Sequence, residues 1–233
     1  MRILAIQNCE AEGFGVLESI FESANARFEI FPAERSLPWP ALDSIDAVIV
    51  GGTPISAYAI DDHPFLVEEE RWLRSAIASG TPCVGICFGG QILARILGAE
   101  VRRAERKEIG IAEITATDAG ATHPLLDGFP PSFPAFQWHG DTFGIPAEAE
   151  LLATGRECRN QMFGIRRVAG VQFHLEIGSR DAAKWGGVYS AELAEFGKTA
   201  EELIREVAPC DAMLEELSRK FVTNFISWAS PAR

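Results

Sequence analysis

The chain has 233 residues, of which 47% are hydrophobic and 23% are charged, the composition of a folded globular protein rather than a disordered one. The 33 acidic residues outnumber the 21 Lys and Arg residues and give a net charge of −12 at pH 7. A field of this sign argues against binding to nucleic acid or to an anionic membrane surface.

Short apolar runs alternate with longer amphipathic stretches over the first hundred residues. Four strands are expected, at Arg2–Gln7, Phe28–Phe31, Ala47–Val50 and Cys83–Ile86. Three helices are expected among them, at Gly13–Ser23, His63–Ser79 and Gln91–Leu97. Apolar strands separated by helices predict an α/β fold with a parallel sheet that is covered on both faces.

The pattern changes after residue 100, where short alternating segments are divided by turn residues. Five further strands are expected, at Ile109–Ala116, Phe133–Gln137, Leu151–Thr154, Met162–Ile165 and Val168–Phe173. They predict antiparallel additions to the same sheet or a small side sheet. The basic run at residues 102–107 is expected to be a solvated hairpin or connection.

After Gly178 the chain is expected to be helical, and an apolar stripe predicts a last helix over Asp211–Trp228. This helix is expected to pack on the core, and packing on a second protein chain is the alternative. We predict a single domain over residues 1–233, with a core at 1–177 and a helical C-terminal segment at 178–233. No apolar run reaches the roughly 18 residues of a membrane span, and the first run is too short for a signal peptide, so a cytoplasmic location is expected.

The most informative segment is Gly85-Ile86-Cys87-Phe88-Gly89-Gly90-Gln91, in which an apolar strand runs into glycines and then a helix. Such a tight turn forces Cys87 into strained backbone geometry and directs its sulfur off the sheet edge, near the positive end of the following helix. This setting favours a nucleophilic thiolate, and the amide of Phe88 could donate to an oxyanion. The alternative is a buried structural cysteine. Among the other four cysteines, Cys83 is expected to lie in the core, and no zinc-type spacing is present.

A thiol nucleophile needs a base, and the chain has four histidines. His63 and His123 precede prolines, and His139 is expected in a loop. His174 lies in Val171-Gln172-Phe173-His174-Leu175-Glu176, which we interpret as a strand. Because alternate residues of a strand face the same side, Glu176 can orient His174 while His174 faces Cys87.

Two alternatives to this base remain open. The polar residues could form a solvated strand face. His174 and Glu176 could also join His139 and Asp141 in a metal site with nitrogen and oxygen ligands, although the thiol turn would then have no role.

Together the two motifs resemble the class I, or triad, glutamine amidotransferases, and most of all stand-alone proteins related to the glutaminase domain of GMP synthase. The resemblance covers about residues 1–177. It implies a flavodoxin-like sheet, a Cys87–His174–Glu176 triad and hydrolysis of the glutamine side-chain amide through a glutamyl thioester. It implies no cofactor and no metal.

The resemblance also implies roles for other residues. Gly51-Gly52-Thr53-Pro54 matches the family's glycine loop, so the amide of Gly52 would complete the oxyanion hole with that of Phe88. Gln91 matches a position that holds the substrate. Trp138-His139-Gly140-Asp141 resembles the second substrate loop, which assigns substrate contacts to Trp138, Gly140 and Asp141.

Two positions depart from the family pattern: Leu175 stands where proline is usual, and Thr53 interrupts glycine-glycine-proline. Neither change removes a side chain that the chemistry needs. The roughly 55 residues after the triad are too few for an ATP-using domain, and no Walker-type loop is present, so ammonia transfer would require a separate synthetase subunit. Three functions stay open: a glutamine-hydrolysing amidotransferase, a free-standing γ-glutamyl hydrolase or peptidase, and a non-catalytic regulatory or binding protein.

Overall fold

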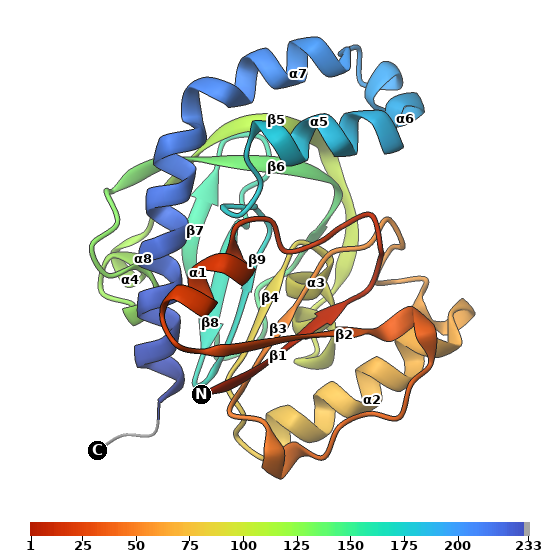
Figure 1. Cartoon of the computed structure of the whole chain (residues 1–233), viewed down its shortest axis with the longest axis vertical. Coiled ribbons are helices and arrows are strands. Elements are labelled where there is room, and N and C mark those ends of the chain that lie inside the picture. The colour runs from red at the N-terminus through yellow and green to blue at the C-terminus, as the bar shows by residue number, and fades with distance from the viewer. Residues whose placement is uncertain (231–233) are drawn as a thin grey trace.

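A computed structural model of the chain describes residues 1–230 and contains one mixed sheet of nine strands (Figure 1). The strands are β1 (Arg2–Gln7), β2 (Arg27–Pro32), β3 (Ala47–Val50), β4 (Cys83–Ile86), β5 (Val101–Ala116), β6 (Ser132–Phe143), β7 (Glu150–Gly155), β8 (Met162–Ile165) and β9 (Val168–Val171). Their order across the sheet is β2-β1-β3-β4-β9-β8-β7-β5-β6.

Eight α-helices accompany the sheet within the described residues. They are α1 (Leu17–Ser23), α2 (Pro64–Ala78), α3 (Phe88–Ile96), α4 (Asp118–Ala121), α5 (Ser179–Val188), α6 (Ser190–Glu195), α7 (Ala200–Val207) and α8 (Asp211–Ala229). Short 3₁₀ turns lie at Ala33–Arg35, Leu42–Ser44, Ile60–Asp62, Pro124–Leu126 and Ala208–Cys210. None of the helices within residues 1–230 has both the length and the apolar character needed to cross a membrane.

The sheet has a parallel half and an antiparallel half. Strands β2, β1, β3, β4 and β9 pair in parallel, whereas β8, β7, β5 and β6 are added to β9 in antiparallel pairs. The predicted α/β class, with a parallel core, antiparallel additions and a helical C-terminal segment, is confirmed.

Helices cover both faces of the parallel half because its strands are apolar on both sides. On one face, α1 and α8 pack against the sheet through buried side chains that include Leu17, Phe21 and Phe225. On the other, α2 and α3 pack through residues such as Leu73 and Ile92. The expectation that the last helix packs on the core is confirmed.

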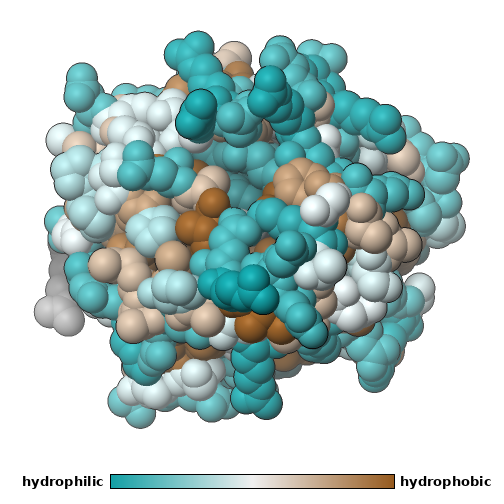
Figure 2. Space-filling view, turned by 90° about the horizontal axis from the view of Figure 1, so that it is seen from above, coloured by the Kyte–Doolittle hydropathy of each residue, from teal (hydrophilic) through white to brown (hydrophobic). Residues whose placement is uncertain are grey.

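The remaining C-terminal helices cover a different part of the sheet. Helices α5, α6 and α7 lie over β5 and β6, and Trp185, Leu193 and Leu203 form a third apolar cluster with Ile109 and Phe136 (Figure 1). Seen from above, where these helices lie in Figure 1, the surface is mostly hydrophilic and apolar residues show only in separate patches (Figure 2).

Several expected boundaries were wrong. The basic run at 102–107 is solvent-exposed as expected, but it belongs to β5, which has an irregularity between Arg103 and Glu108. Strand β6 extends to Phe143, so Trp138–Asp141 is a strand segment and His139 is not in a loop. Polar side chains at solvated or hydrogen-bonded positions hid both extensions, because they break the apolar run that marks a strand.

The helix and strand beside the cysteine motif also differ from expectation. Helix α3 begins at Phe88, directly after Cys87, rather than at Gln91. Strand β9 ends at Val171, earlier than expected. The extended path nevertheless continues, because the backbones of His174 and Phe136 exchange hydrogen bonds of 2.8 and 2.9 Å.

Candidate active site

Cys87 occupies a strained turn between β4 and α3. Its φ of 55° and ψ of −113° lie outside the regions that residues with a side chain normally adopt. The glycines on either side permit this path, since a Cβ at Gly85 would collide with the backbone of Gly89, and one at Gly89 with the carbonyl of Val50. The turn therefore places the thiol at the amino end of α3, as the motif predicts.

His174 and Glu176 form a buried pair. The Nδ1 atom of His174 lies 2.6 Å from Oε1 of Glu176, and both side chains are almost inaccessible to solvent. The Nε2 atom of His174 is also buried and has no hydrogen-bond partner among residues 1–230. Glu176 thus fixes one ring nitrogen and leaves the other available to a neighbour.

The sulfur of Cys87 is close enough to His174 to influence the pKa of its ring. The amide of Cys87 donates to the carbonyl of Val171 at 2.8 Å, which holds the turn against the segment that leads to His174. Burial by itself would lower the pKa of His174, but the carboxylate of Glu176 and the nearby Cys87 sulfur raise it to about 10. The structure therefore brings the three predicted triad residues together.

Gly52 lies close to Cys87. A Cβ at Gly52 would be 4.0 Å from the Cβ of Cys87 and would collide with Oε2 of Glu12. Phe88 is the first residue of α3, so its amide is one of the unpaired N–H groups at the helix start. The two residues predicted to supply oxyanion donors thus flank Cys87.

The predicted substrate residues also lie close to the thiol. The side-chain amide of Gln91 donates to the backbone carbonyl of Asp141 at 3.4 Å and to Oε1 of Gln172 at 3.2 Å. The carbonyl of Trp138 lies 3.8 Å from the sulfur of Cys87. The Trp138–Asp141 segment is therefore a wall of the site, although it is a strand rather than the expected loop.

A cavity of about 320 Å³ opens above Cys87. It is lined by the expected Cys87, Phe88, Gln91, Trp138, Gly140 and Asp141, and also by Glu12, Thr53, Pro54, Ile55, His139, Trp185, Tyr189 and Glu192. His174 is not in the lining, and its side chain is buried.

Sequence reasoning missed several of these residues. Gln172, which strand alternation places on the same face as His174, was given no role, yet its side-chain amide donates to the Cys87 sulfur at 3.7 Å. Trp185 and Tyr189 come from the C-terminal segment and reach the site through tertiary packing, which leaves no motif. The hydroxyl of Tyr189 donates to Oε1 of Glu12 at 2.7 Å.

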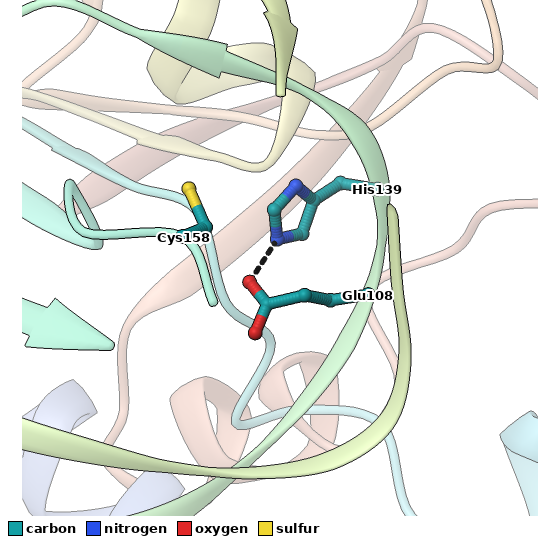
Figure 3. A group of neighbouring side chains, drawn as sticks. All are labelled: Glu108, His139 and Cys158. Atoms are coloured by element: carbon teal, nitrogen blue, oxygen red, sulfur yellow. Dashed lines mark hydrogen bonds and ion pairs between the residues drawn. The ribbon is translucent and has the colours of Figure 1, made fainter. Parts of the chain in front are cut away.

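A second group also contains one cysteine, one histidine and one glutamate. Glu108 on β5, His139 on β6 and Cys158 between β7 and β8 are all buried, and their possible ligand atoms lie within 4.8 Å of one another (Figure 3). The Nε2 atom of His139 is 3.0 Å from Oε2 of Glu108. The group thus has the residue types of a triad.

Its connections differ from those of the first group. The Nδ1 atom of His139 lies 2.9 Å from the carbonyl of Asp141, so both ring nitrogens are occupied. The Cys158 thiol donates to the hydroxyl of Thr142 at 3.1 Å, and burial raises the pKa of that thiol. A second buried donor, Gln161, reaches Glu108 at 3.1 Å. These contacts form a satisfied hydrogen-bond network beneath the wall of the cavity.

The metal site considered from the sequence is not assembled as expected. His174 pairs with Glu176 and His139 pairs with Glu108, while the carboxylate of Asp141 accepts a hydrogen bond of 2.6 Å from Ser56.

Leu175, which stands where the family usually has proline, is buried. Its side chain is buried in the apolar cluster that includes Phe173 and Phe221, and its carbonyl accepts a hydrogen bond of 2.9 Å from Ser218 on α8. With leucine at this position, His174 and Glu176 are paired.

Comparison with known proteins agrees with this fold. Residues 6–184 match the family model for glutamine amidotransferase class-I. A crystal structure of a glutamine amidotransferase from Thermotoga maritima has a TM-score of 0.90 and 30% sequence identity, and the alignment covers 97% of this chain and 98% of that one. The chain belongs to the class I glutamine amidotransferase family.

Curated relatives match over shorter regions. The glutamine amidotransferase-like protein YfeJ of Salmonella typhimurium is 33% identical over 149 residues, which are 62% of this chain and 62% of YfeJ. One subunit of the glutamine-hydrolysing GMP synthase of Sulfolobus acidocaldarius is 31% identical over 58% of this chain and 70% of its own length. The GMP synthase of Thermomicrobium roseum is 32% identical over 66% of this chain but only 28% of its own length.

Proposed function

We propose that the chain hydrolyses the side-chain amide of glutamine through a glutamyl thioester, with Cys87 as nucleophile, His174 as base and Glu176 as the group that orients the base. One observation carries the proposal: the Cys87 thiol stands in a strained turn, at the base of a cavity, beside a buried His174–Glu176 pair with one free ring nitrogen. Membership of the class I glutamine amidotransferase family supports the same reaction class.

The first half-reaction breaks the amide bond. His174 takes the thiol proton, and the sulfur of Cys87 attacks the amide carbon to give a tetrahedral oxyanion. The backbone amides of Gly52 and Phe88, which belong to residues beside Cys87, are proposed to stabilise this charge. The carbon–nitrogen bond then breaks as His174 returns the proton to the nitrogen, which leaves as ammonia.

The second half-reaction releases glutamate. His174 removes a proton from water, the resulting hydroxide attacks the thioester carbon, and the carbon–sulfur bond breaks to restore Cys87. The raised pKa of His174 favours the imidazolium, which holds the thiolate by charge attraction and supplies the proton for the leaving nitrogen. This scheme needs no cofactor and no metal, because one thiol and one imidazole complete the proton transfers.

The glutamyl part of the substrate is proposed to lie against Gln91 and the Trp138–Asp141 wall. The contact between Gln91 and the Asp141 carbonyl supports this placement, since it joins the two predicted substrate segments on one side of the thiol. Trp138, Gly140 and Asp141 line the cavity there and would contact the amino and carboxylate groups.

A separate synthetase subunit is the proposed acceptor of the ammonia. The similarity to the Sulfolobus acidocaldarius relative, which is named as one subunit of a GMP synthase, supports a two-chain arrangement of this kind.

A second candidate function is a free-standing γ-glutamyl hydrolase. It is favoured by the extension of the cavity past Cys87 to Glu12, Trp185 and Tyr189, on the side of His174. A leaving group larger than ammonia would occupy that region.

An assay of the isolated chain tests the proposal and separates the two candidates. Release of ammonia from glutamine is measured beside release of amine from a panel of γ-glutamyl amides and peptides, with Cys87→Ala as the control for contaminating activity. Turnover of glutamine that disappears in Cys87→Ala supports the amidotransferase, and selective cleavage of larger amides supports the hydrolase. A chain that cleaves none of these substrates, or a Cys87→Ala variant with full activity, would contradict the proposed chemistry.

A further inference from the structure

The cavity above Cys87 is lined by three carboxylates and by no lysine or arginine of the described residues. Glu192 is already paired, since its Oε1 lies 2.7 Å from the ammonium of Lys107. Glu12 and Asp141 have no ion-pair partner within residues 1–230. Each accepts a hydrogen bond from a hydroxyl group, Glu12 from Tyr189 and Asp141 from Ser56. The cavity thus offers two carboxylates to a ligand.

Glu12 lies on the side of His174. The Tyr189 hydroxyl that binds Glu12 belongs to a ring whose centroid is 6.5 Å from that of Trp185. The edge of Trp185 in turn meets the ring of His174, at 5.2 Å between centroids. Burial raises the pKa of Glu12, while the Tyr189 hydroxyl and the nearby charge of His174 oppose that rise.

This side of the thiol is where a leaving group must depart. His174 is the proposed acid for the leaving nitrogen, so that nitrogen has to pass within hydrogen-bond reach of its ring. Asp141 lies instead beside Gln91, on the side proposed for the glutamyl group. The two unpaired carboxylates are therefore assigned to different parts of one substrate.

We infer that the region formed by Glu12, Trp185 and Tyr189 is a leaving-group subsite that selects γ-glutamyl amides whose amine part carries a second, positively charged ammonium group. The inference rests on the proposed thiol chemistry. It names the substrate class for the second candidate function, the free-standing γ-glutamyl hydrolase. The γ-glutamyl group supplies one ammonium for Asp141, and the leaving amine supplies the other for Glu12. The rings of Trp185 and Tyr189 add cation–π attraction.

The reaction is balanced with water as the only co-reactant. The sulfur of Cys87 forms a bond to the side-chain amide carbon of the γ-glutamyl group (Cδ), and the bond from that carbon to the amide nitrogen breaks. His174 transfers its proton to this nitrogen, which leaves as the free end of a diamine. Water then hydrolyses the thioester to glutamate and regenerates the thiol.

A pair of substrates of equal length tests the inference on the full chain. The γ-glutamyl amide of 1,4-diaminobutane ends in an ammonium group, whereas the γ-glutamyl amide of pentylamine ends in a methyl group at the same position. The wild type is expected to show a kcat/KM about 10- to 100-fold higher for the diamine conjugate, the range that one charged hydrogen bond supplies.

Variants locate the source of this preference. Glu12→Gln keeps an acceptor for Tyr189 but loses the charge, so the preference should fall to within about threefold of equality. Tyr189→Phe should reduce it partly, because Glu12 is no longer held in place. Glu10→Gln is the matched control, since Glu10 is exposed in the same loop, and it should leave the preference unchanged.

The outcomes separate this inference from the proposed function. Equal cleavage of both amides by the wild type, with dependence on Cys87, would overturn the cationic subsite and leave the thiol chemistry standing. A preference that survives in Glu12→Gln would also overturn it. Failure to cleave these amides and glutamine alike would overturn the inference and the proposed function together.

Discussion

Two groups of the same three residue types lie a short distance apart in this sheet, and the Trp138–Asp141 segment touches both. In the first, Cys87 sits in a strained turn at a helix start, and one nitrogen of its histidine is free. In the second, Cys158 donates to Thr142 and both nitrogens of His139 are occupied. Residue types and proximity therefore do not define a nucleophilic site; the backbone geometry of the cysteine and an unoccupied nitrogen on the base do.

The largest expected difference between the two groups is the loss of activity when the cysteine is replaced by alanine. Cys87→Ala should lower kcat/KM for the best γ-glutamyl substrate by about four orders of magnitude or more, because no other group can form the thioester. Cys158→Ala should keep activity within about threefold of the wild type and lower the free energy of unfolding by about 1–2 kcal/mol. Steady-state kinetics and urea denaturation measure the two effects, and a reversed pattern would exchange the roles of the two groups.

Substitution of His174 should mainly reduce activity, whereas substitution of His139 should mainly reduce stability. His174→Gln is expected to reduce kcat by roughly a thousandfold, since the base and acid are lost together. His139→Gln should lower the free energy of unfolding by about 1–3 kcal/mol, because a buried charged hydrogen bond is weakened, with an effect on KM larger than that on kcat. A large loss of kcat in His139→Gln with an unchanged KM would argue that the second group takes part in the chemistry.

The glutamates should differ in the pH dependence of activity. The proposed acid is the His174 imidazolium, whose pKa is raised to about 10, so kcat/KM should fall as pH rises through that region. Glu176→Gln removes the negative charge that favours the imidazolium, so it should lower this pKa and move the falling limb to lower pH, with a loss of roughly 10- to 100-fold in rate. Glu108→Gln is the control and should leave the limb in place. A limb that does not move in Glu176→Gln would show that Glu176 does not act on the catalytic imidazole.

Much of the first group could be predicted from the sequence because it depends on residues that lie close together along the chain. A strand, a glycine-flanked cysteine and a helix follow one another around Cys87, and alternation along one extended segment places Glu176 beside His174. The parallel half of the sheet was predictable for a similar reason, since each buried strand is a continuous apolar run.

The second group and the far side of the cavity could not be predicted in this way. Glu108 and His139 meet because β5 and β6 pair, and Cys158 joins them from a turn, so no spacing in the chain marks the set. Trp185 and Tyr189 reach the cavity only because α5 packs over β5 and β6. Where polar residues are buried by pairing of distant strands, apolar periodicity carries no information about them.

Labelling with an irreversible, glutamine-derived diazo ketone is the most direct test of the claim that Cys87 is the activated thiol. The intact chain would be treated near pH 7.5 with and without excess glutamine, digested, and its five cysteines mapped by mass spectrometry. Burial raises the pKa of Cys83 to about 12 and also raises that of Cys158, so both should stay protonated and unreactive. We predict one adduct, on Cys87, that glutamine suppresses; an adduct on Cys158 with Cys87 unmodified would contradict the account.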